Sequence, residues 1–167
     1  MELTPLDNEV CVTTVPIETL IDQAFLAMEK AYAPYSGFKV GAALLAGNGT
    51  VYQGCNIENA AYTPCNCAER TAFFKAVSEG VKEFDAICIV GGKAGKVTEL
   101  TAPCGVCRQV MMEFCNPDTF LIILAVSQDN YRVFTLKEML PMGFGPDNFD
   151  VPMPKETVGT SLLSKLK

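Results

Sequence analysis

Apolar residues recur at helical spacing in three stretches of the chain, and each stretch predicts an amphipathic helix. The first is expected over residues 16–32, the second over 67–79 and the third over 103–114. Pro34 and Gly80 follow the first two stretches, where residues that end a helix are expected. The pattern therefore predicts three helices, separated by segments of a different pattern.

Five mostly apolar runs between and after these helices predict β-strands. They cover residues 38–46, 51–56, 84–90, 119–126 and 131–135. Asn48-Gly49 between the first two is a strong hairpin signal, and Gly91-Gly92 is expected to end the third. Only a few residues around 128–130 join the last two strands. A parallel crossover needs a dozen or more, so these two strands should pair antiparallel.

The order of these elements predicts an α/β fold, in which one mixed five-stranded sheet is covered by helices. A length of 167 residues suits a single domain over 1–167 that is large enough for a real core. Residues 1–15 are expected to form an irregular lead-in to the first helix.

Composition narrows the classes of function. Hydrophobic residues make up 49% of the chain and charged ones 19%, which excludes a disordered protein. The net charge of -6 and the pI of about 4.7 argue against nucleic acid or an anionic membrane as a partner, since both require clustered lysine and arginine. The chain has no histidine, so proton transfer near neutral pH must use another group or metal-bound water.

An even count of eight cysteines could indicate disulfide bonds, but the N-terminal sequence argues against an exported protein. The N-terminal residues include neither a basic region nor an apolar export segment, and no apolar run approaches membrane-spanning length. We therefore expect a cytoplasmic protein, in which thiols stay reduced and paired cysteines more often bind a metal. The eight cysteines are Cys11, Cys55, Cys65, Cys67, Cys88, Cys104, Cys107 and Cys115.

Three of these cysteines form a candidate zinc site. Cys104 and Cys107 have the spacing at which two thiolates bind one zinc ion, and Cys67 offers a third. Three protein ligands leave the fourth tetrahedral position open for water. Glu69 follows the first ligand closely and is placed to transfer protons from that water. The pattern predicts a hydrolytic zinc site.

The negative charge of three thiolates must be offset, because it opposes the loss of a proton from water on the metal. Cys67 and Cys104 lie at predicted helix N-termini, where the backbone dipole favours a negative ligand and lowers the pKa of a thiol. Arg70 can also donate hydrogen bonds to a thiolate sulfur from outside the ligand shell. We expect Arg70 to support zinc binding.

A structural zinc site is the alternative interpretation, and in it Glu69 is only an acid favoured at a helix start. A fourth thiolate would have to come from Cys65, which is closer to Cys67 than the usual ligand spacing, so Cys65 is expected outside the shell. The remaining cysteines are expected to be structural thiols: Cys11, Cys55, Cys88 and Cys115.

The segments CAER at 67–70 and PCGVCRQ at 103–109 together resemble the zinc-dependent cytidine deaminases in their short all-cysteine form. Further similarity lies in YAPYSGFKVGAALL at 32–45, NIENAAYTPCNCAERTAFFKA at 56–76 and LPMGFGPDNF at 140–149. The resemblance covers roughly residues 17–150, the expected core of the domain. It implies a three-layer α-β-α fold, one zinc ion per subunit and a homotetramer.

The resemblance also implies a reaction. Cytidine, and by extension 2′-deoxycytidine, would be hydrolysed to uridine or 2′-deoxyuridine with release of ammonia, in pyrimidine salvage. Glu69 would activate the zinc-bound water that attacks carbon 4 of the cytosine ring, and would pass the proton to ring nitrogen 3.

Substrate contacts follow from the same resemblance. Asn56 and Glu58 match positions that hydrogen-bond the ribose hydroxyls, and Phe38 matches an aromatic residue of the pocket. The backbone of Ala68 matches a group that reads the base.

Two further positions, Tyr62 and Phe144, match residues that reach a neighbouring subunit's site in tetrameric relatives. The alternative for Phe38 and Phe144 is an ordinary place in the core. Asn59 is expected to stabilise its loop rather than to contact the ligand.

Three other functions compete with cytidine deamination. A related deaminase could act on another cytosine-like compound, such as blasticidin S, but the Asn56–Asn59 segment and Arg70 favour a ribonucleoside. A deaminase of polynucleotides is disfavoured by the acidic chain. A non-catalytic zinc module that binds a protein partner would show no dependence on Glu69.

Overall fold

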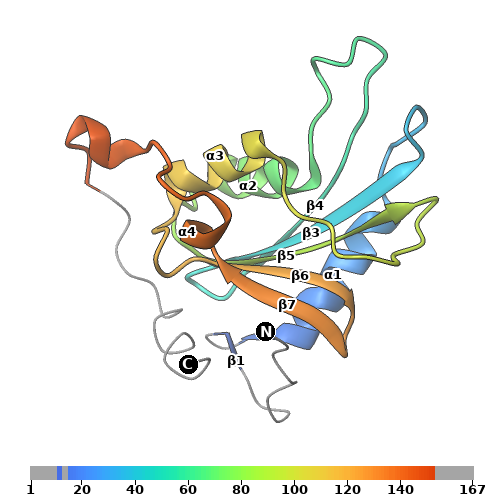
Figure 1. Cartoon of the computed structure of the whole chain (residues 1–167), viewed down its shortest axis with the longest axis horizontal. Coiled ribbons are helices and arrows are strands. Elements are labelled where there is room, and N and C mark those ends of the chain that lie inside the picture. Colours follow the sequence, from blue (N-terminus) through green and yellow to red (C-terminus); the bar gives the residue numbers. More distant parts are fainter. Residues whose placement is uncertain (1–10, 13–14, 153–167) are drawn as a thin grey trace.

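A five-stranded sheet lies between helices in this computed structural model, which describes residues 11–12 and 15–152 (Figure 1). The strands of the sheet are β3 (Phe38–Ala46), β4 (Val51–Cys55), β5 (Phe84–Lys93), β6 (Leu121–Ser127) and β7 (Asn130–Thr135). The helices are α1 (Ile17–Glu29), α2 (Ala68–Ser78), α3 (Gly105–Phe114), α4 (Leu136–Met139) and the 3-10 helix η1 (Pro146–Phe149). Most of the predicted lead-in and the side chain of Cys11 lie outside the described residues.

The sheet is mixed, as predicted. Its strand order is β4-β3-β5-β6-β7. β3 pairs antiparallel with both β4 and β5, whereas β5 and β6 are parallel and have α3 in their crossover. β6 and β7 pair antiparallel, which confirms the prediction from their short connection. The parallel pair and its crossover helix bring the start of α3 to one face of the sheet.

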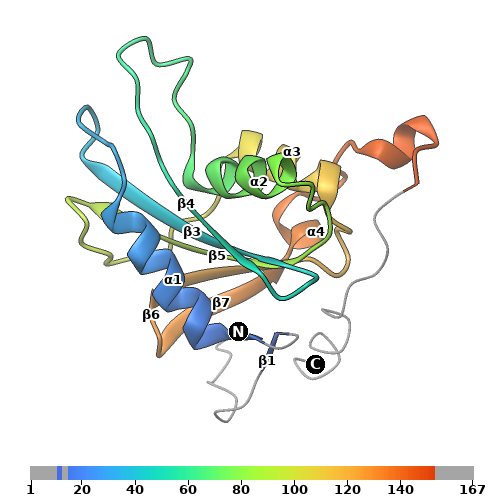
Figure 2. The same ribbon diagram turned by 180° about the vertical axis from the view of Figure 1, so that it is seen from behind.

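Alternation of side chains along the strands gives the sheet two apolar faces. On one face Leu44 and Ile87 pack with residues of α2, α3 and α4. On the other face their neighbours Leu45 and Cys88 pack with α1. The two views show α1 alone on one side of the sheet and the other helices opposite (Figures 1 and 2). The fold therefore has three layers, α-β-α.

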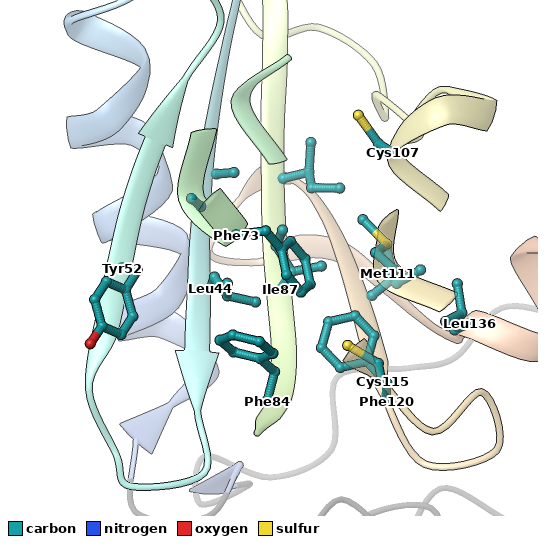
Figure 3. Packing of buried hydrophobic residues seen from close by; sticks show 14 of the residues in the cluster. Leu44, Tyr52, Phe73, Phe84, Ile87, Cys107, Met111, Cys115, Phe120 and Leu136 are labelled. Carbon is teal, nitrogen blue, oxygen red and sulfur yellow. The ribbon is translucent and has the colours of Figure 1, made fainter. Parts of the chain in front are cut away.

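Three buried phenylalanines hold α2 against the sheet. Phe73 of α2 lies edge-on to Phe84 of β5, with ring centroids 4.9 Å apart, and Phe120 lies beside them (Figure 3). Burial of each such side chain contributes roughly 1.5–3 kcal/mol. The packing fixes the position of α2, and therefore of Cys67 at its start.

Two glycines let helices lie directly on strand backbones. A side chain at Gly41 of β3 would overlap the backbone of α1 at Ala24, and one at Gly54 of β4 would overlap the backbone of α2 at Ala68. No other residue fits at such a close approach. Gly54 thus sets the distance between β4 and the first turn of α2.

Several element boundaries differ from the sequence prediction. Gly91 and Gly92 do not end β5, which continues to Lys93 in register with Phe38. Gly92 lies against the backbone of Lys96, where a side chain would collide, so this strand position requires glycine. Residues 11–12, within the predicted irregular lead-in, pair antiparallel with residues 15–16, where the lead-in was expected to meet the first helix.

The ends of the helices also differ from the prediction. Pro16 is the N-cap of α1 rather than its first residue, and the helix ends at Glu29 instead of near residue 32. Helices α4 and η1 are absent from the prediction. Helix α4 spans only Leu136–Met139 and η1 only Pro146–Phe149. Both are too short for apolar residues to recur at helical spacing.

Candidate active site

The N-terminal ends of α2 and α3 bring together the three predicted zinc ligands. The sulfur atoms of Cys67, Cys104 and Cys107 all lie within 4.8 Å of one another. Cys104 lies 3.8 Å from Cys67 and 3.5 Å from Cys107. Tetrahedral zinc with bonds of about 2.3 Å to sulfur separates its thiolates by about 3.8 Å. The cluster therefore fits one zinc ion and leaves one coordination position to another ligand.

Both helices begin at the ligands themselves. Cys67 is the N-cap of α2 and Cys104 the N-cap of α3, which confirms their predicted places at helix N-termini. In neither helix does the cap side chain bond the first-turn amides. The partial positive charge of these helix N-termini lies next to the two cysteines and favours thiolates.

Hydrogen bonds to Cys67 favour its ionised form. A hydrogen bond with the Cys107 thiol, supported by the Arg70 guanidinium, lowers the pKa of Cys67 to about 5. The same bond raises the pKa of Cys107. The two shifts have one cause, the hydrogen bond between neighbouring thiols, and a metal that binds both would displace the proton of that bond.

Arg70 lies where the sequence suggested. Its Nη2 donates to the Cys67 sulfur at 3.7 Å and to the Cys65 carbonyl at 3.3 Å. One side chain thus compensates thiolate charge and fixes the loop that leads into α2. Since Nη2 reaches both acceptors, the thiolate and the loop keep a defined relative position.

Glu69 lies inside the first turn of α2 and is only 4% exposed. Burial raises the pKa of its carboxyl to about 7, and the negative charge of Cys67 acts in the same direction. Hydrogen bonding to Cys107 opposes this shift. A carboxyl with this pKa can both accept and release a proton near neutral pH.

The other described cysteines stay outside the cluster. The sulfur of Cys65 accepts a hydrogen bond from the Asn59 amide at 3.1 Å, away from the three ligand sulfurs. Cys88 and Cys115 are buried in the core, and Cys55 is half-buried. The Asn59 side chain accepts a bond from the Ala61 amide at 2.9 Å, as expected for a residue that stabilises its loop.

Asn56 and Glu58 are anchored to backbone groups of the strand and loop before them. The Asn56 amide accepts from Val40 N and donates to Phe38 O, each at 2.8 Å. The Glu58 carboxylate accepts from the amides of Tyr35 and Ser36 at 2.8 and 3.2 Å. The Ser36 side chain also hydrogen-bonds the Glu58 carboxylate. Each side chain still has hydrogen-bonding capacity to spare, one N–H in Asn56 and further lone pairs in the Glu58 carboxylate.

The remaining candidates differ in their exposure. Phe38 is half-buried at the start of β3, beside Gly91, and Ala68 is fully buried at the start of α2. Tyr62 and Phe144 are exposed, at 72% and 58%. This exposure excludes the alternative that Phe144 is an ordinary core residue.

The motif residues Arg108 and Gln109 also make contacts that no sequence pattern revealed. Arg108 donates to Pro103 O and Met139 O, and Gln109 donates to Phe144 O. These acceptors are backbone carbonyls, and those of Met139 and Phe144 lie 31 and 35 residues further along the chain. Only the position of a donor-rich residue directly after a ligand could have drawn attention to Arg108.

Comparison with known proteins supports this description. The family described as the cytidine and deoxycytidylate deaminase zinc-binding region matches residues 15–123. The chain belongs to this family. Such membership confirms the prediction of a zinc-dependent hydrolase over a purely structural zinc module.

Relatives cover most of the domain. The cytidine deaminase of Sporosarcina psychrophila is 49% identical over 132 residues, which are 79% of this chain and 93% of the relative. The crystal structure of cytidine deaminase from Burkholderia pseudomallei is 48% identical, with a TM-score of 0.71, over 78% of this chain and 100% of the other. The crystal structure of cytidine deaminase from Mycobacterium tuberculosis is 39% identical, with a TM-score of 0.65, over 75% and 94%. The cytidine deaminase fold predicted from the motifs is confirmed.

Within residues 11–12 and 15–152, no helix is both long and apolar enough to cross a membrane.

Proposed function

We propose that this protein hydrolyses cytidine, and also 2′-deoxycytidine, to the corresponding uridine with release of ammonia. The observation that carries the proposal is the buried Glu69 carboxyl, which lies in the first turn of α2 beside a cluster of three thiols shaped for zinc. A structural zinc site has no use for a buried carboxyl of raised pKa beside its ligands.

Cys67, Cys104 and Cys107 would hold the zinc ion, which supplies Lewis-acid activation of water. Glu69 accepts a proton from the attacking water and delivers it to ring nitrogen 3 as carbon 4 is attacked. It then takes the proton of the new hydroxyl group on carbon 4 and delivers it to the amino group, which departs as ammonia while the carbon 4 carbonyl forms. Because burial raises the pKa of its carboxyl, Glu69 is suited to serve as base and then as acid in one turnover.

The nucleoside is held by groups that the fold has already oriented. The unused N–H of Asn56 and the remaining lone pairs of the Glu58 carboxylate are assigned to the ribose hydroxyls, and Phe38 to the face of the pyrimidine ring. The backbone at Ala68 is assigned to the base. Because Asn56 and Glu58 are fixed by backbone amides and carbonyls, little side-chain entropy is lost on binding.

The working unit is proposed to be a homotetramer. Exposed aromatic side chains support an interface, since large apolar groups at the surface mark places where proteins associate. They include Tyr32, Tyr35, Tyr62, Phe144 and Phe149. In this assembly Tyr62 and Phe144 would act at the site of a neighbouring subunit.

A cytoplasmic place in pyrimidine salvage accompanies this activity. The three ligand thiols and the other described cysteines are free, and free thiols of this number persist in a reducing compartment. Salvage follows from the chemistry, because deamination converts one reusable nucleoside into another.

Ammonia release from cytidine by the zinc-loaded protein tests the proposal. Replacement of Glu69 by Gln keeps size and hydrogen bonding but removes the proton carrier. We expect turnover to fall by at least about a thousandfold, while the zinc content and the circular-dichroism spectrum stay as in the wild type. An active Glu69→Gln protein would refute the assigned role. Absence of turnover in the folded, zinc-loaded wild type would refute the substrate.

A further inference from the structure

Helix α3 contacts the segment 139–145 through side chains next to its zinc ligands. Arg108 and Gln109 follow Cys107 directly, and both donate hydrogen bonds to backbone carbonyls of this segment. The segment leads from α4 to Phe144, and η1, which follows it, projects from the body of the chain (Figures 1 and 2). The metal-binding helix therefore holds the part of the chain that carries Phe144.

Arg108 bridges two backbone segments with two different nitrogen atoms. Its Nε donates to the carbonyl of Pro103 at 2.8 Å, and its Nη1 donates to the carbonyl of Met139 at 2.6 Å. The Pro103 carbonyl belongs to the peptide group that joins Pro103 to Cys104. The guanidinium thus fixes the backbone of one zinc ligand relative to the end of α4.

Two further contacts extend the attachment along the helix. Gln109 Nε2 donates to the Phe144 carbonyl at 2.9 Å. Further along α3, Met112 lies so close to Gly145 that an added side chain there would approach its methyl carbon to 3.0 Å. Bonds and packing of α3 therefore define the path of residues 139–145.

We propose that Arg108 and Gln109 are positioning residues, which transmit the placement of the zinc-binding helix to Phe144. Any shift of α3 that accompanies metal binding at Cys104 and Cys107 moves the carbonyls to which the two side chains are bonded. Phe144 then reaches the position in which it contacts substrate only when α3 is in its metal-bound position. The role given to Phe144 rests on the proposed function. The effect of zinc on residues 139–145 does not, because it involves only the metal and the protein.

Hydrogen–deuterium exchange of the whole protein, with and without zinc, tests the structural part. In the wild type, zinc should slow exchange both in α3 and in residues 139–145, by about fivefold in the latter, because local opening of the bonded segment becomes harder when α3 is held by the metal. In Arg108→Ala and Gln109→Ala, α3 should still respond to zinc, whereas residues 139–145 should not. A wild-type response of 139–145 in both variants would overturn the proposal.

Two comparison variants separate positioning from general effects. Glu113→Ala changes an exposed residue of the same helix and should leave the zinc response of 139–145 as in the wild type. Arg108→Lys keeps the charge but not the planar fork of donors, so it should behave like Arg108→Ala. A wild-type zinc response of residues 139–145 in Arg108→Lys would show that a positive charge at position 108 is sufficient, contrary to the proposal.

Kinetics of the same variants test the link to Phe144. Gln109→Ala should raise KM for cytidine by about fivefold and change kcat by less than about twofold, because it loosens a substrate contact and leaves Glu69 and the thiols in place. An unchanged KM would overturn this link. If the wild type shows no turnover of cytidine, the proposed function fails, while the exchange result is decided independently.

Discussion

Arg70 is the side chain on which the charge balance of the thiol cluster depends most directly. It is bonded to the Cys67 sulfur and to the carbonyl of Cys65, so it acts on a ligand and on the loop before it. We expect Arg70→Ala to weaken zinc binding by about 10- to 100-fold, the usual effect of removing a residue that supports a metal ligand. Competition with a chromophoric chelator measures this change.

The control for that variant is Arg132→Ala, which removes the same charge from an exposed position on β7. Its zinc affinity should equal that of the wild type. Equal zinc affinity and equal turnover in Arg70→Ala and the wild type would show that the helix N-termini alone balance the thiolates.

Glu58 provides a pH-dependent contact at the proposed ribose site. Hydrogen bonds from Ser36, and from the Tyr35 amide, lower the pKa of its carboxyl below the ordinary 4.5. A lowered pKa in the folded chain means that the contact stabilises the loop above about pH 4.5 and is lost as the pH falls through the folded value. The Tyr35 and Ser36 amide signals in NMR spectra should therefore titrate at pH values below about 4.5.

Replacement of Glu58 by Gln should abolish this titration, because the amide has no proton to gain in that range. Amide signals of Tyr35 and Ser36 that stay constant down to about pH 2.5 in the wild type would contradict the assignment of the carboxylate as their acceptor.

The zinc ligands and the carboxylate beside them were the part of the site that the sequence predicted best. The spacing of Cys104 and Cys107, with Cys67 and Glu69 beside a predicted helix start, suggested a hydrolytic zinc site without any structure. The contacts of Asn56 with β3 could not be foreseen, because side-chain bonds to backbone groups leave no periodic trace in the sequence.

At the scale of elements, close packing between β4 and α2 determines where Cys67 lies. Gly54 touches the backbone of α2 at Ala68 and Ala72, and an added methyl group has no space. We expect Gly54→Ala to displace the first turn of α2, to destabilise the protein by about 2 kcal/mol and to lower zinc affinity. Urea unfolding and a zinc titration measure the two effects.

Gly47→Ala is the matched substitution at a roomy position, since an added side chain there would lie 3.6 Å from Glu83. It should change stability by less than about 1 kcal/mol and leave zinc binding intact. A Gly54→Ala protein as stable as Gly47→Ala would show that α2 can move without cost.

Long elements were predicted well and short ones were missed. Helices α1, α2 and α3 have apolar residues at helical spacing and the five strands are mostly apolar runs, so their existence followed from the sequence. The continuation of β5 through Gly91 and Gly92 could not be predicted. Glycine within a strand usually indicates the end of the strand, unless it is known that another backbone segment packs against it. Helix α4 begins with a capping box at Thr135 and Glu138, a local signal that hydrophobic periodicity does not contain.

For the whole molecule, the exposed aromatics predict assembly. Phe144 and Phe149 lie edge-on to each other at the surface, and Tyr35 lies near Tyr62. We expect sedimentation equilibrium to give four times the chain mass of 18.0 kDa. A mass of 18.0 kDa at micromolar concentration would refute the tetramer, and the role of Phe144 at a neighbouring site with it.

The separation of the ligands along the chain has a consequence for folding. Cys104 and Cys107 can meet in an unfolded chain, but Cys67 lies 37 residues before Cys104 and reaches it only after that loop has closed. Closure requires the sheet, because α2 follows β4 and α3 precedes β6. A thiolate triad for tight zinc binding therefore exists only in chains that have nearly finished folding, and the rate of metal uptake during refolding should follow the last step of assembly rather than the first.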